Sequence, residues 1–525
     1  MLFMGRLRML LLLITFFIIA SLLAVYNFGQ FAKRAKGQET YALPVNNEQT
    51  RLDRVLTPAL NAHPHESSLT LIPSNLDAFA IRAMSAREAG RSIDLQYYIW
   101  KDDITGQLLG LELLEAADRG VRVRILLDDL NSHGYSSMLA IINQHPNIDI
   151  RMFNPTRARG NPLFRGIEIL LRAFSINRRM HNKAWIVDGR IAIVGGRNIA
   201  NEYFDAAESR NFFDVDLLTA GVAVQETETI FDDFWNSDAS IPLSALYKVS
   251  EQDLINLKEK INQQKSSLSA LPYLEKLKQS PSVQSLFNGN WSQTGWKLYW
   301  SNDVHVYSDP AVKVFDEDQE NWLYRQLWSS LNQAKHSIHL ISPYFVPGKH
   351  GVQQFAELQK QGTNVNILTN SLVANDVIMA HGGYAPYRKS LLQNGIQLHE
   401  LKPFGKTSRS LIGNSGASLH TKAFLVDENT GFVGSFNFDP RSTNLNTEMG
   451  IIFHVPEIIQ SLEQEFILRS SDRYSYHVYL ENNQLRWFDA DDKDDSTIWQ
   501  HDPESHWWQR AVAKIIGYLP IESQL

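Results

Sequence analysis

The feature that most constrains this chain is an internal duplication. Three segments of the first half recur in the second half, and the pairs are Ser92–Tyr98 with Ser337–Tyr344, Gly120–Leu126 with Gly362–Leu368, and Met180–Ala184 with Leu419–Ala423. The offsets between the paired segments are 245, 242 and 239 residues. A nearly constant offset over about ninety residues indicates two copies of one fold.

Each copy shows the same local pattern of strands and helices. An apolar, β-rich run, Ser92–Trp100 or Ser337–Val346, precedes a segment of helical period, Leu108–Asp118 or Val352–Gln361. Such alternation implies right-handed crossovers and a sheet covered by helices. We therefore expect an α/β protein of two lobes related by a pseudo-twofold axis. Each lobe should be a mixed or parallel sheet flanked by helices.

Each copy also contains the motif H-x-K-x-x-x-x-D. The motif residues are His181, Lys183 and Asp188 in the first copy, and His420, Lys422 and Asp427 in the second. An asparagine follows each histidine at the same spacing, Asn198 and Asn437. Residues two apart on a strand share a face, so each histidine should project together with its lysine. Two such strands meeting at the axis would surround one phosphate with two imidazoles and two ammonium groups.

This set of residues is suited to cleaving a phosphodiester through a phosphohistidine. One imidazole attacks phosphorus, while the other protonates the leaving oxygen and later accepts a proton from the incoming alcohol or water. Lysine and asparagine side chains stabilise charge on the equatorial oxygens. The attacking imidazole needs a carboxylate on its other nitrogen. Asp214 and Glu448 are the candidates, with an ordinary turn or capping role as the alternative.

The motif aspartates complete the predicted catalytic set but differ from it in position. Asp188 and Asp427 lie an odd number of residues from their histidines, so they should face the other side of the strand. We expect them to order the lobes more than to touch substrate. Neither a metal nor another cofactor is expected, because lysine is a poor ligand and the sequence has no HExxH motif or carboxylate cluster.

The N-terminus predicts a membrane helix. No charged residue occurs between Arg8 and Lys33, and an apolar helix of about 20 residues crosses the hydrocarbon core. Arg6 and Arg8 would also suit a cleaved signal peptide, but no A-x-A-like cleavage site follows. We therefore expect one uncleaved span. Basic residues flank it on both sides, which leaves its orientation open.

Size and composition bound the remaining possibilities. A chain of 525 residues accommodates two catalytic-sized units with appendages. The net charge of −7 argues against non-specific binding of nucleic acid. The absence of cysteine excludes disulfides, thiolate metal sites and a cysteine nucleophile. The predicted parts are a membrane segment (1–36), a linker (37–64), the first lobe (65–240), a connection (241–300), the second lobe (301–475) and a C-terminal extension (476–525).

Three further segments have specific interpretations. The polar stretch Leu254–Lys278 is helical in tendency and belongs to the connection between the lobes. Leu163–Phe174 mixes large apolar residues with arginines, which fits either a membrane-interface segment or a half-buried amphipathic helix. Trp507 and Trp508 fit either an interfacial anchor or core packing, and core packing is the favoured interpretation.

The double motif resembles that of the phospholipase D superfamily, and the resemblance covers most of residues 65–470. It implies that both motifs share one active site and that no metal is used. Within the superfamily the chain is most similar to bacterial C-type cardiolipin synthases. The stretches that carry this similarity are Leu95–Trp100, Leu126–Asp129, Val194–Ile199, Gly434–Asn437, Asp439–Ser442, Asn446–Glu448 and Leu519–Glu522.

The resemblance implies a phosphatidyltransferase of the bacterial inner membrane. Such an enzyme transfers a phosphatidyl group to the headgroup of phosphatidylglycerol and makes cardiolipin, and the C-type is associated with phosphatidylethanolamine as donor. By analogy His181 would be the nucleophile. The alternative is a phospholipase D-type hydrolase acting on phospholipid or, less favoured, on nucleic acid. The expected partners are phospholipids and the membrane, with no nucleic acid; the sequence indicates no protein partner.

Overall fold

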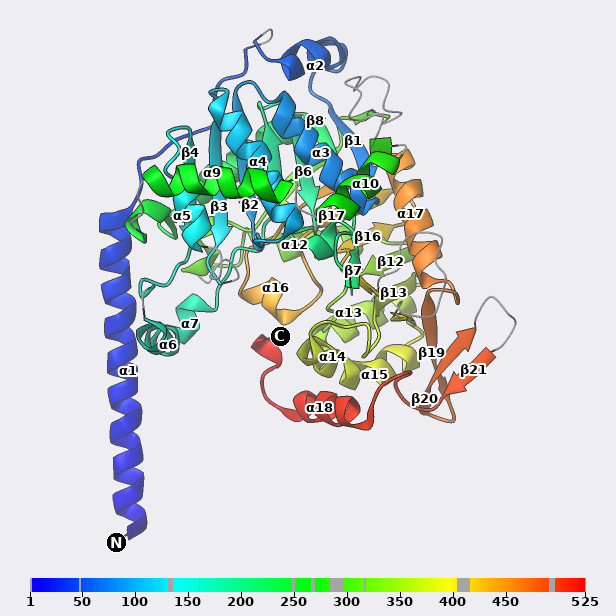
Figure 1. Cartoon of the computed structure of the whole chain (residues 1–525). Helices are drawn as coiled ribbons and strands as arrows, with labels where there is room; N and C mark the ends of the chain where they lie inside the picture. The colour runs from blue at the N-terminus through cyan, green and yellow to red at the C-terminus, as the bar shows by residue number, and fades with distance from the viewer. Residues whose placement is uncertain are drawn as a thin grey trace.

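The computed structural model describes residues 2–46, 49–130, 136–159, 161–208, 210–247, 251–265, 270–280, 282–283, 297–315, 318–403, 416–490 and 496–524. Two large sheets with helices around them form the body of the molecule (Figure 1). The N-terminal helix α1 (Leu2–Ala35) extends away from this body as a single rod. Its most apolar stretch is not buried, which confirms the expected apolar N-terminal helix.

The two sheets share one strand order, which confirms the duplication. In order across the first sheet, the strands are β10 (Tyr299–Ser301), β1 (Ser67–Ile72), β8 (Asp216–Gly221), β6 (Ile191–Gly195), β5 (Ala184–Val187), β2 (Ser92–Tyr97), β3 (Arg122–Asp128), β4 (Ile148–Phe153) and β9 (Ser240–Pro242). Across the second they are β11 (Val304–Ser308), β18 (Met449–Phe453), β17 (Thr430–Gly434), β16 (Ala423–Val426), β12 (Ser337–Ile341), β13 (Asn364–Asn370), β14 (Gln397–Leu401), β19 (Ser475–Glu481), β20 (Gln484–Ala490) and β21 (Ser496–Trp499). Strands β2–β4 and β12–β14 pair in parallel and their other partners are antiparallel, so each sheet is mixed, as predicted.

Helices cover the sheets and also fill the space between the lobes. The predicted helical segments form α4 (Ile104–Asp118) and α13 (Gly348–Lys360). Helices α8 (Val222–Trp235) and α17 (Pro456–Ser470) contribute to an apolar core shared by both lobes. Residues from both sheets meet in this core, including Val194 of β6 and Val433 of β17. The lobes are therefore packed as one hydrophobic unit.

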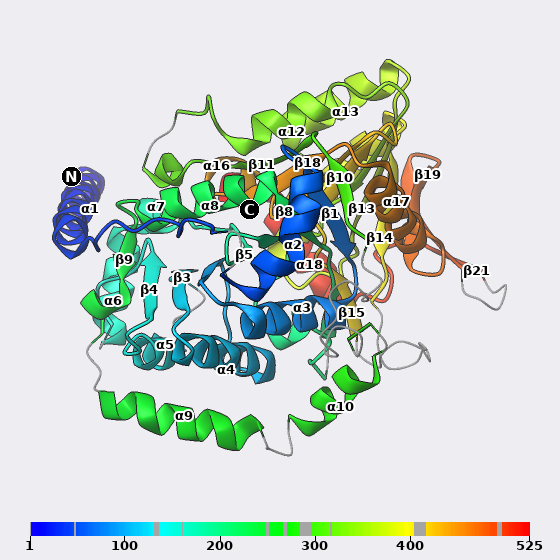
Figure 2. The ribbon, with the colours of Figure 1, turned by 90° about the horizontal axis from the view of Figure 1, so that it is seen from above.

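The polar stretch assigned to the connection between the lobes folds into two helices. They are α9 (Glu251–Lys265) and α10 (Leu271–Gln279), and Figure 2 shows both along the outer surface of the first lobe. Leu254, Leu257 and Tyr273 pack into the core of that lobe. The connection therefore follows the first lobe before the chain enters the second.

Two short parallel strands tie the lobes together next to the motifs. They are β7 (Arg210–Phe213) of the first lobe and β15 (Gly416–Leu419) of the second. On the other side of the axis, Met180 forms a parallel bridge with Thr447. The amide of His181 donates to the carbonyl of Thr447 at 2.8 Å, and the amide of His420 donates to that of Phe213 at 2.8 Å. Each catalytic-motif histidine is thus positioned by the backbone of the opposite lobe.

Two segments that the sequence left open are exposed. Helix α6 (Pro162–Leu171) has no fully buried residue, and its large apolar side chains Leu163, Phe164, Ile167 and Leu170 are exposed, while Arg172 directly after it is buried. In α18 (Trp507–Tyr518), Trp507 is 75% exposed and Trp508 is 48% exposed. The favoured interpretation of these tryptophans as core residues is therefore wrong. The helix packs on the body through Ala513 and Ile516 instead.

The motif aspartates bind backbone amides of their own lobes. Both occupy turns with positive φ, 56° at Asp188 and 52° at Asp427. The amides that donate to Asp188 are those of Gly90, Arg91 and Ser92, and those that donate to Asp427 are Lys335, His336 and Ser337. These amides lead into β2 and β12, so each carboxylate fixes the start of a central strand.

Replacing Asp188 with alanine should destabilise the fold. The carboxylate is buried and satisfies three amides, so its loss would leave buried donors without an acceptor. We expect the free energy of unfolding to fall by roughly 2–4 kcal/mol. Asp188→Asn, which keeps one acceptor oxygen, should lose less, and thermal unfolding of both variants measures the difference. Equal stability of the alanine variant and wild type would contradict this role.

Candidate active site

The four basic side chains of the motifs come from the segments that lead directly into a central strand of each sheet. His181 and Lys183 directly precede β5, while His420 and Lys422 directly precede β16. Both strands are hydrogen-bonded on both sides, which fixes the backbone from which the side chains project. All four side chains are buried. In each motif the lysine Nζ donates to its histidine's carbonyl at 2.6 Å, so histidine and lysine lie together as predicted.

Each imidazole is hydrogen-bonded to a carboxylate of the other lobe. Nδ1 of His181 lies 2.8 Å from Oε2 of Glu448, and Nδ1 of His420 lies 2.7 Å from Oδ2 of Asp214. Both carboxylates are buried. Asp214 and Glu448, the candidates selected from the sequence, therefore each bind a histidine, and the lobes exchange these carboxylates: each one serves the histidine of the other lobe. The sequence did not indicate this exchange.

Burial keeps the imidazoles neutral. It lowers the pKa of His181 to about 4, an effect that Glu448 opposes and Lys183 reinforces. Burial also lowers the pKa of His420 well below its usual value, and Lys422, Lys183 and His181 lower it further. Each neutral ring then donates its Nδ1–H to a carboxylate and keeps a lone pair on Nε2. Because the groups of one motif affect the pKa of the other, the two motifs form a single electrostatic site.

The two lysines are matched in both position and environment. Burial lowers the pKa of Lys183 to about 7 and that of Lys422 to about 8. The Nζ atom of Lys183 lies 5.6 Å from the ring centre of Tyr98, and that of Lys422 lies 5.9 Å from the ring centre of Tyr344. Buried ammonium groups without a full complement of acceptors attract an anion strongly. This arrangement suits the oxygens of a phosphodiester.

The two carboxylates differ in their immediate surroundings. Ser435 donates its hydroxyl to Oε2 of Glu448. His181 and Lys183 are the main causes that keep the pKa of Glu448 below its usual value despite burial, and the bond from Ser435 adds to them. The equivalent position beside Asp214 is Gly196, where a Cβ atom would lie 2.6 Å from Oδ1. Burial there raises the pKa of Asp214 to about 6. The half-sites are therefore alike in geometry, but the pKa of the supporting carboxylate is lowered in one and raised in the other.

The motif asparagines have different surroundings. Asn198 accepts from the amide of Ile99 at 3.1 Å, and its Nδ2 donates to the hydroxyl of Tyr203 at 2.9 Å. Its side chain therefore reaches the site through Tyr203, whose ring stands edge-on to His420 at 5.0 Å. Among the described residues, Oδ1 of Asn437 is buried without a hydrogen-bond partner. Contact of either asparagine with a phosphate stays a prediction.

The aromatic residues around the imidazoles are the part of the site that the sequence reasoning missed. Tyr98 stands edge-on to His181 at 4.9 Å, and Phe212 lies 5.1 Å from His420. A signal for Tyr98 and Tyr344 was present, because each ends a matched segment of the duplication. No comparable repeat marks Phe212, which lies in the cross-lobe strand β7.

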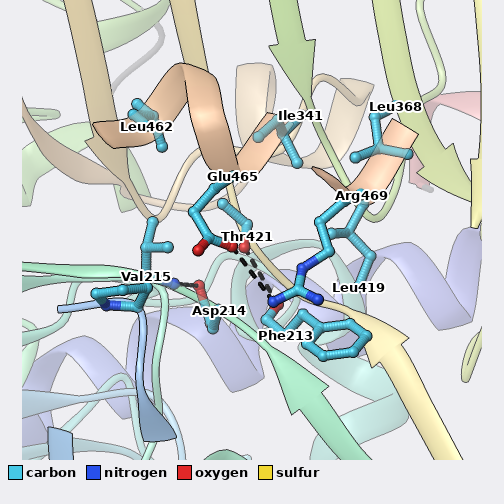
Figure 3. A pocket seen from close by; sticks show the side chains of 11 residues that line it. Phe213, Asp214, Val215, Ile341, Leu368, Leu419, Thr421, Leu462, Glu465 and Arg469 are labelled. Carbon is cyan, nitrogen blue, oxygen red and sulfur yellow. Dashed lines mark hydrogen bonds and ion pairs between the residues drawn. The ribbon is translucent and has the colours of Figure 1, made fainter. Parts of the chain in front are cut away.

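A small pocket opens behind the second half-site. Figure 3 shows Asp214 and Thr421 among the residues that line it, with Glu465 and Arg469 of α17 close to them. The guanidinium of Arg469 lies over the ring of Phe213 at 4.0 Å and bonds to Glu465 at 3.3 Å. The motif histidines and lysines do not line this pocket. It therefore approaches the supporting carboxylate from the back of the site.

Comparison with known proteins identifies the family. The family model described as cardiolipin synthase, PLD-like domain, matches residues 84–235 and 327–469. Cardiolipin synthase C of Escherichia coli strain K12 is 37% identical over 478 residues, which cover 90% of this chain and 99% of the relative. The chain belongs to the phospholipase D-like cardiolipin synthase family. It is accordingly a phospholipid phosphatidyltransferase, as the sequence predicted.

More distant relatives agree with this assignment. A cardiolipin synthase of Halalkalibacterium halodurans is 25% identical over 78% of this chain and 67% of its own length. The crystal structure of phosphatidylserine synthase from Haemophilus influenzae Rd KW20 superposes with a TM-score of 0.56 at 13% identity. It covers 90% of this chain and 99% of that one, so the two-lobed fold is shared throughout.

The lysines predict how activity depends on pH. They stabilise a phosphate only while protonated, and their pKa values of about 7 and about 8 mean that the charge is lost as the pH rises through this range. We expect kcat/KM for a non-titrating phosphodiester to fall above pH 7, because kcat/KM reports the free enzyme. Lys183→Arg, if active, should move the fall upward toward the pKa of Lys422. A profile that stays flat to about pH 9.5 would contradict this role of the lysines.

Proposed function

We propose that the enzyme makes cardiolipin by transferring a phosphatidyl group from a donor phospholipid, with phosphatidylethanolamine as the expected donor, to phosphatidylglycerol in a bacterial inner membrane. The observation that carries the proposal is the pair of buried, neutral imidazoles, each held at Nδ1 by a carboxylate of the other lobe and each beside a lysine. The near full-length similarity to cardiolipin synthase C supports the choice of product.

The first half-reaction forms a phosphohistidine. Nε2 of His181 attacks the phosphorus of the donor, and the bond from phosphorus to the headgroup oxygen breaks. His420 gives its Nε2 proton to that oxygen, so the headgroup leaves as a neutral hydroxyl. The two lysines stabilise the charge that spreads over the non-bridging oxygens. The bound phosphodiester is itself an anion, and its charge raises the pKa of His420 toward the protonated form that an acid requires.

The second half-reaction reverses the roles of the same atoms. A hydroxyl of the phosphatidylglycerol headgroup gives its proton to Nε2 of His420 and attacks phosphorus. The bond between phosphorus and Nε2 of His181 breaks, and the diester that forms is cardiolipin. Water in place of the lipid hydroxyl would give phosphatidic acid, so the outcome depends on excluding water from the intermediate.

The unequal half-sites support His181 as the nucleophile. Glu448, which holds Nδ1 of His181, has a lowered pKa and stays charged, so the tautomer with a lone pair on Nε2 is well stabilised. In the described part of the chain, Nε2 of His181 has no hydrogen-bond partner, whereas Nε2 of His420 lies 3.4 Å from the hydroxyl of Tyr203 and 3.2 Å from Nζ of Lys422. The freer nitrogen is better placed to attack.

The products formed on mixed lipid vesicles test the proposed function. The full-length protein should convert phosphatidylethanolamine and phosphatidylglycerol to cardiolipin with little phosphatidic acid, as identified by mass spectrometry. Asp188→Asn, corrected for folded protein, serves as the control for a motif residue outside the site. Phosphatidic acid as the main product would contradict a synthase and support the phospholipase D alternative.

A donor with a good leaving group tests which histidine attacks. Nitrophenolate leaves a phosphatidyl ester of p-nitrophenol without needing a proton. His420→Ala should therefore still release about one equivalent of nitrophenolate per enzyme molecule and then stall. His181→Ala should release none, and an increase in protein mass should locate the phosphatidyl group on His181 in the first variant. A burst in His181→Ala but not in His420→Ala would reverse the assignment.

A further inference from the structure

We infer that α6, α7 (Ala173–Ile176) and α18 form a docking surface that rests on the bilayer leaflet from which α1 emerges, beside the segments that lead into the active site. The inference rests on the proposed function and names the surface from which that site takes its substrates. We define the docking surface by its exposed apolar residues, which are Leu163, Phe164, Ile167, Leu170, Phe174, Trp507, Trp508, Val512, Ile515, Tyr518 and Leu519.

Helix α1 fixes the depth of α6 relative to the bilayer. The uncharged run from Met9 to Ala32 must supply the span, and about 20 residues are needed to cross the hydrocarbon core of ~30 Å. Counted from Met9, such a span reaches Phe28. Helix α6 packs against α1, and on α1 the residues Ala20, Ala24 and Phe28, four apart, form a half-buried face. The guanidinium of Arg172, which directly follows α6, lies over the ring of Phe28, so the C-terminal end of α6 lies level with the end of this span.

Helix α6 has the composition of an interfacial helix. Phe164 is 62% exposed and Phe174, just beyond the helix, is 88% exposed, although α6 is fixed at both ends by hydrogen bonds. The side chain of Asn161 caps its first turn, and Glu168 binds the backbone of Arg157. Exposed aromatic and aliphatic side chains on a helix that is fixed to the protein body indicate a surface that is covered by lipid.

Helix α18 presents a second apolar stripe on the same side of the molecule. Trp508, Val512, Ile515 and Leu519 follow the helical period and are all exposed, while the opposite face packs on α14 (Ile378–Tyr384). Figure 1 shows α6 and α18 on the side toward which α1 extends, with α2 (Arg51–Ala62) on the opposite side. The two stripes and the membrane helix therefore face one bilayer.

The docking surface is connected directly to the active site. Helix α7 ends at Ile176, only a few residues before His181. After α18 the chain returns to the first lobe, where Asn177 donates to Oε1 of Gln524 at 2.6 Å. Arg441 of α16 (Pro440–Asn444) donates to the carbonyls of Gln524 and Asn177, at 3.3 and 2.9 Å. Both stripes are thus joined to the segments that surround the motifs.

Positive charge borders the apolar surface where headgroups would lie. The guanidinium of Arg157, which is exposed, lies 5.1 Å from the ring centre of Phe31. Lys33 and Arg34 form the last turn of α1. Cationic side chains at the end of a membrane helix favour anionic headgroups such as that of phosphatidylglycerol. The charge therefore matches the lipid that the proposed function requires as acceptor.

Site-specific spin labels measure whether the docking surface meets lipid. The chain contains no cysteine, so single cysteines can be introduced without background. We would label Phe164→Cys and Ile515→Cys, with Val55→Cys of α2 as the matched control, because Val55 is also apolar and is 41% exposed. The full-length protein is reconstituted in vesicles of phosphatidylethanolamine and phosphatidylglycerol. Accessibility to oxygen and to a water-soluble nickel complex then gives the depth of each label.

Labels at positions 164 and 515 should be more accessible to oxygen than to nickel, and the label at 55 should show the reverse. A nickel accessibility at 164 and 515 equal to that at 55 would overturn the inference, and an aqueous label at 515 alone would overturn it for α18. Because this readout does not depend on activity, lipid-exposed labels on a protein that makes no cardiolipin would preserve the docking surface and reject the proposed function.

Charge substitutions provide a second, independent test. Phe164→Glu and Ile515→Glu should each lower turnover on vesicles by about tenfold, because a carboxylate weakens burial of an interfacial helix. Val55→Glu, on the opposite side, should retain the turnover of wild type. Unchanged turnover in both docking-surface variants would contradict the inference, and circular dichroism on the same samples checks that they are folded.

Discussion

Two imidazole–carboxylate hydrogen bonds cross the boundary between the lobes, and the arrangement of both sheets serves to make them. Each histidine is buried, and an imidazole with an unsatisfied N–H in such a place is costly. The carboxylate that satisfies it belongs to the other lobe in both cases. The backbone pairing of β7 with β15, and of Met180 with Thr447, ends beside these bonds and sets their register. One lobe alone would therefore carry a histidine and a lysine without the group that orients them.

The same burial explains why the site suits an anion. Two ammonium groups are held away from water with their pKa values lowered to about 7 and about 8, so the protein stabilises their charges only partly. A phosphodiester brings the missing negative charge, and its arrival raises the pKa of every basic group around it. Part of the cost of burying the lysines is thus recovered only when substrate is present. The two buried lysines therefore favour binding of an anionic phosphodiester.

The duplication, the mixed sheets and the strands that carry the motifs could be predicted from the sequence, because apolar periodicity and repeated spacing act locally along the chain. Ala184–Val187 and Ala423–Val426 are the buried strands that directly follow the motif lysines. The sequence could not predict that Asp214 and Glu448 each bind the histidine of the other lobe. Residue spacing describes a single strand and does not say which segment of the other lobe lies beside it. The core interpretation of Trp507 and Trp508 failed for a related reason: a helical apolar stripe has the same pattern whether it faces protein or lipid.

A duplicated fold gives two equivalent half-sites, whereas the reaction needs one nucleophile and one acid. The two copies differ in the carboxylate, Asp214 or Glu448, and in the residue beside it, Gly196 or Ser435. The pKa of Glu448 is lowered mainly by His181 and Lys183, with a smaller effect of the Ser435 hydroxyl, whereas burial raises the pKa of Asp214. A side chain at position 196 would also collide with Asp214, so the shorter carboxylate and the glycine depend on each other. Symmetry therefore supplies the geometry of the site, and the proposed division of roles between the two histidines rests on the different pKa shifts of the carboxylates that hold them.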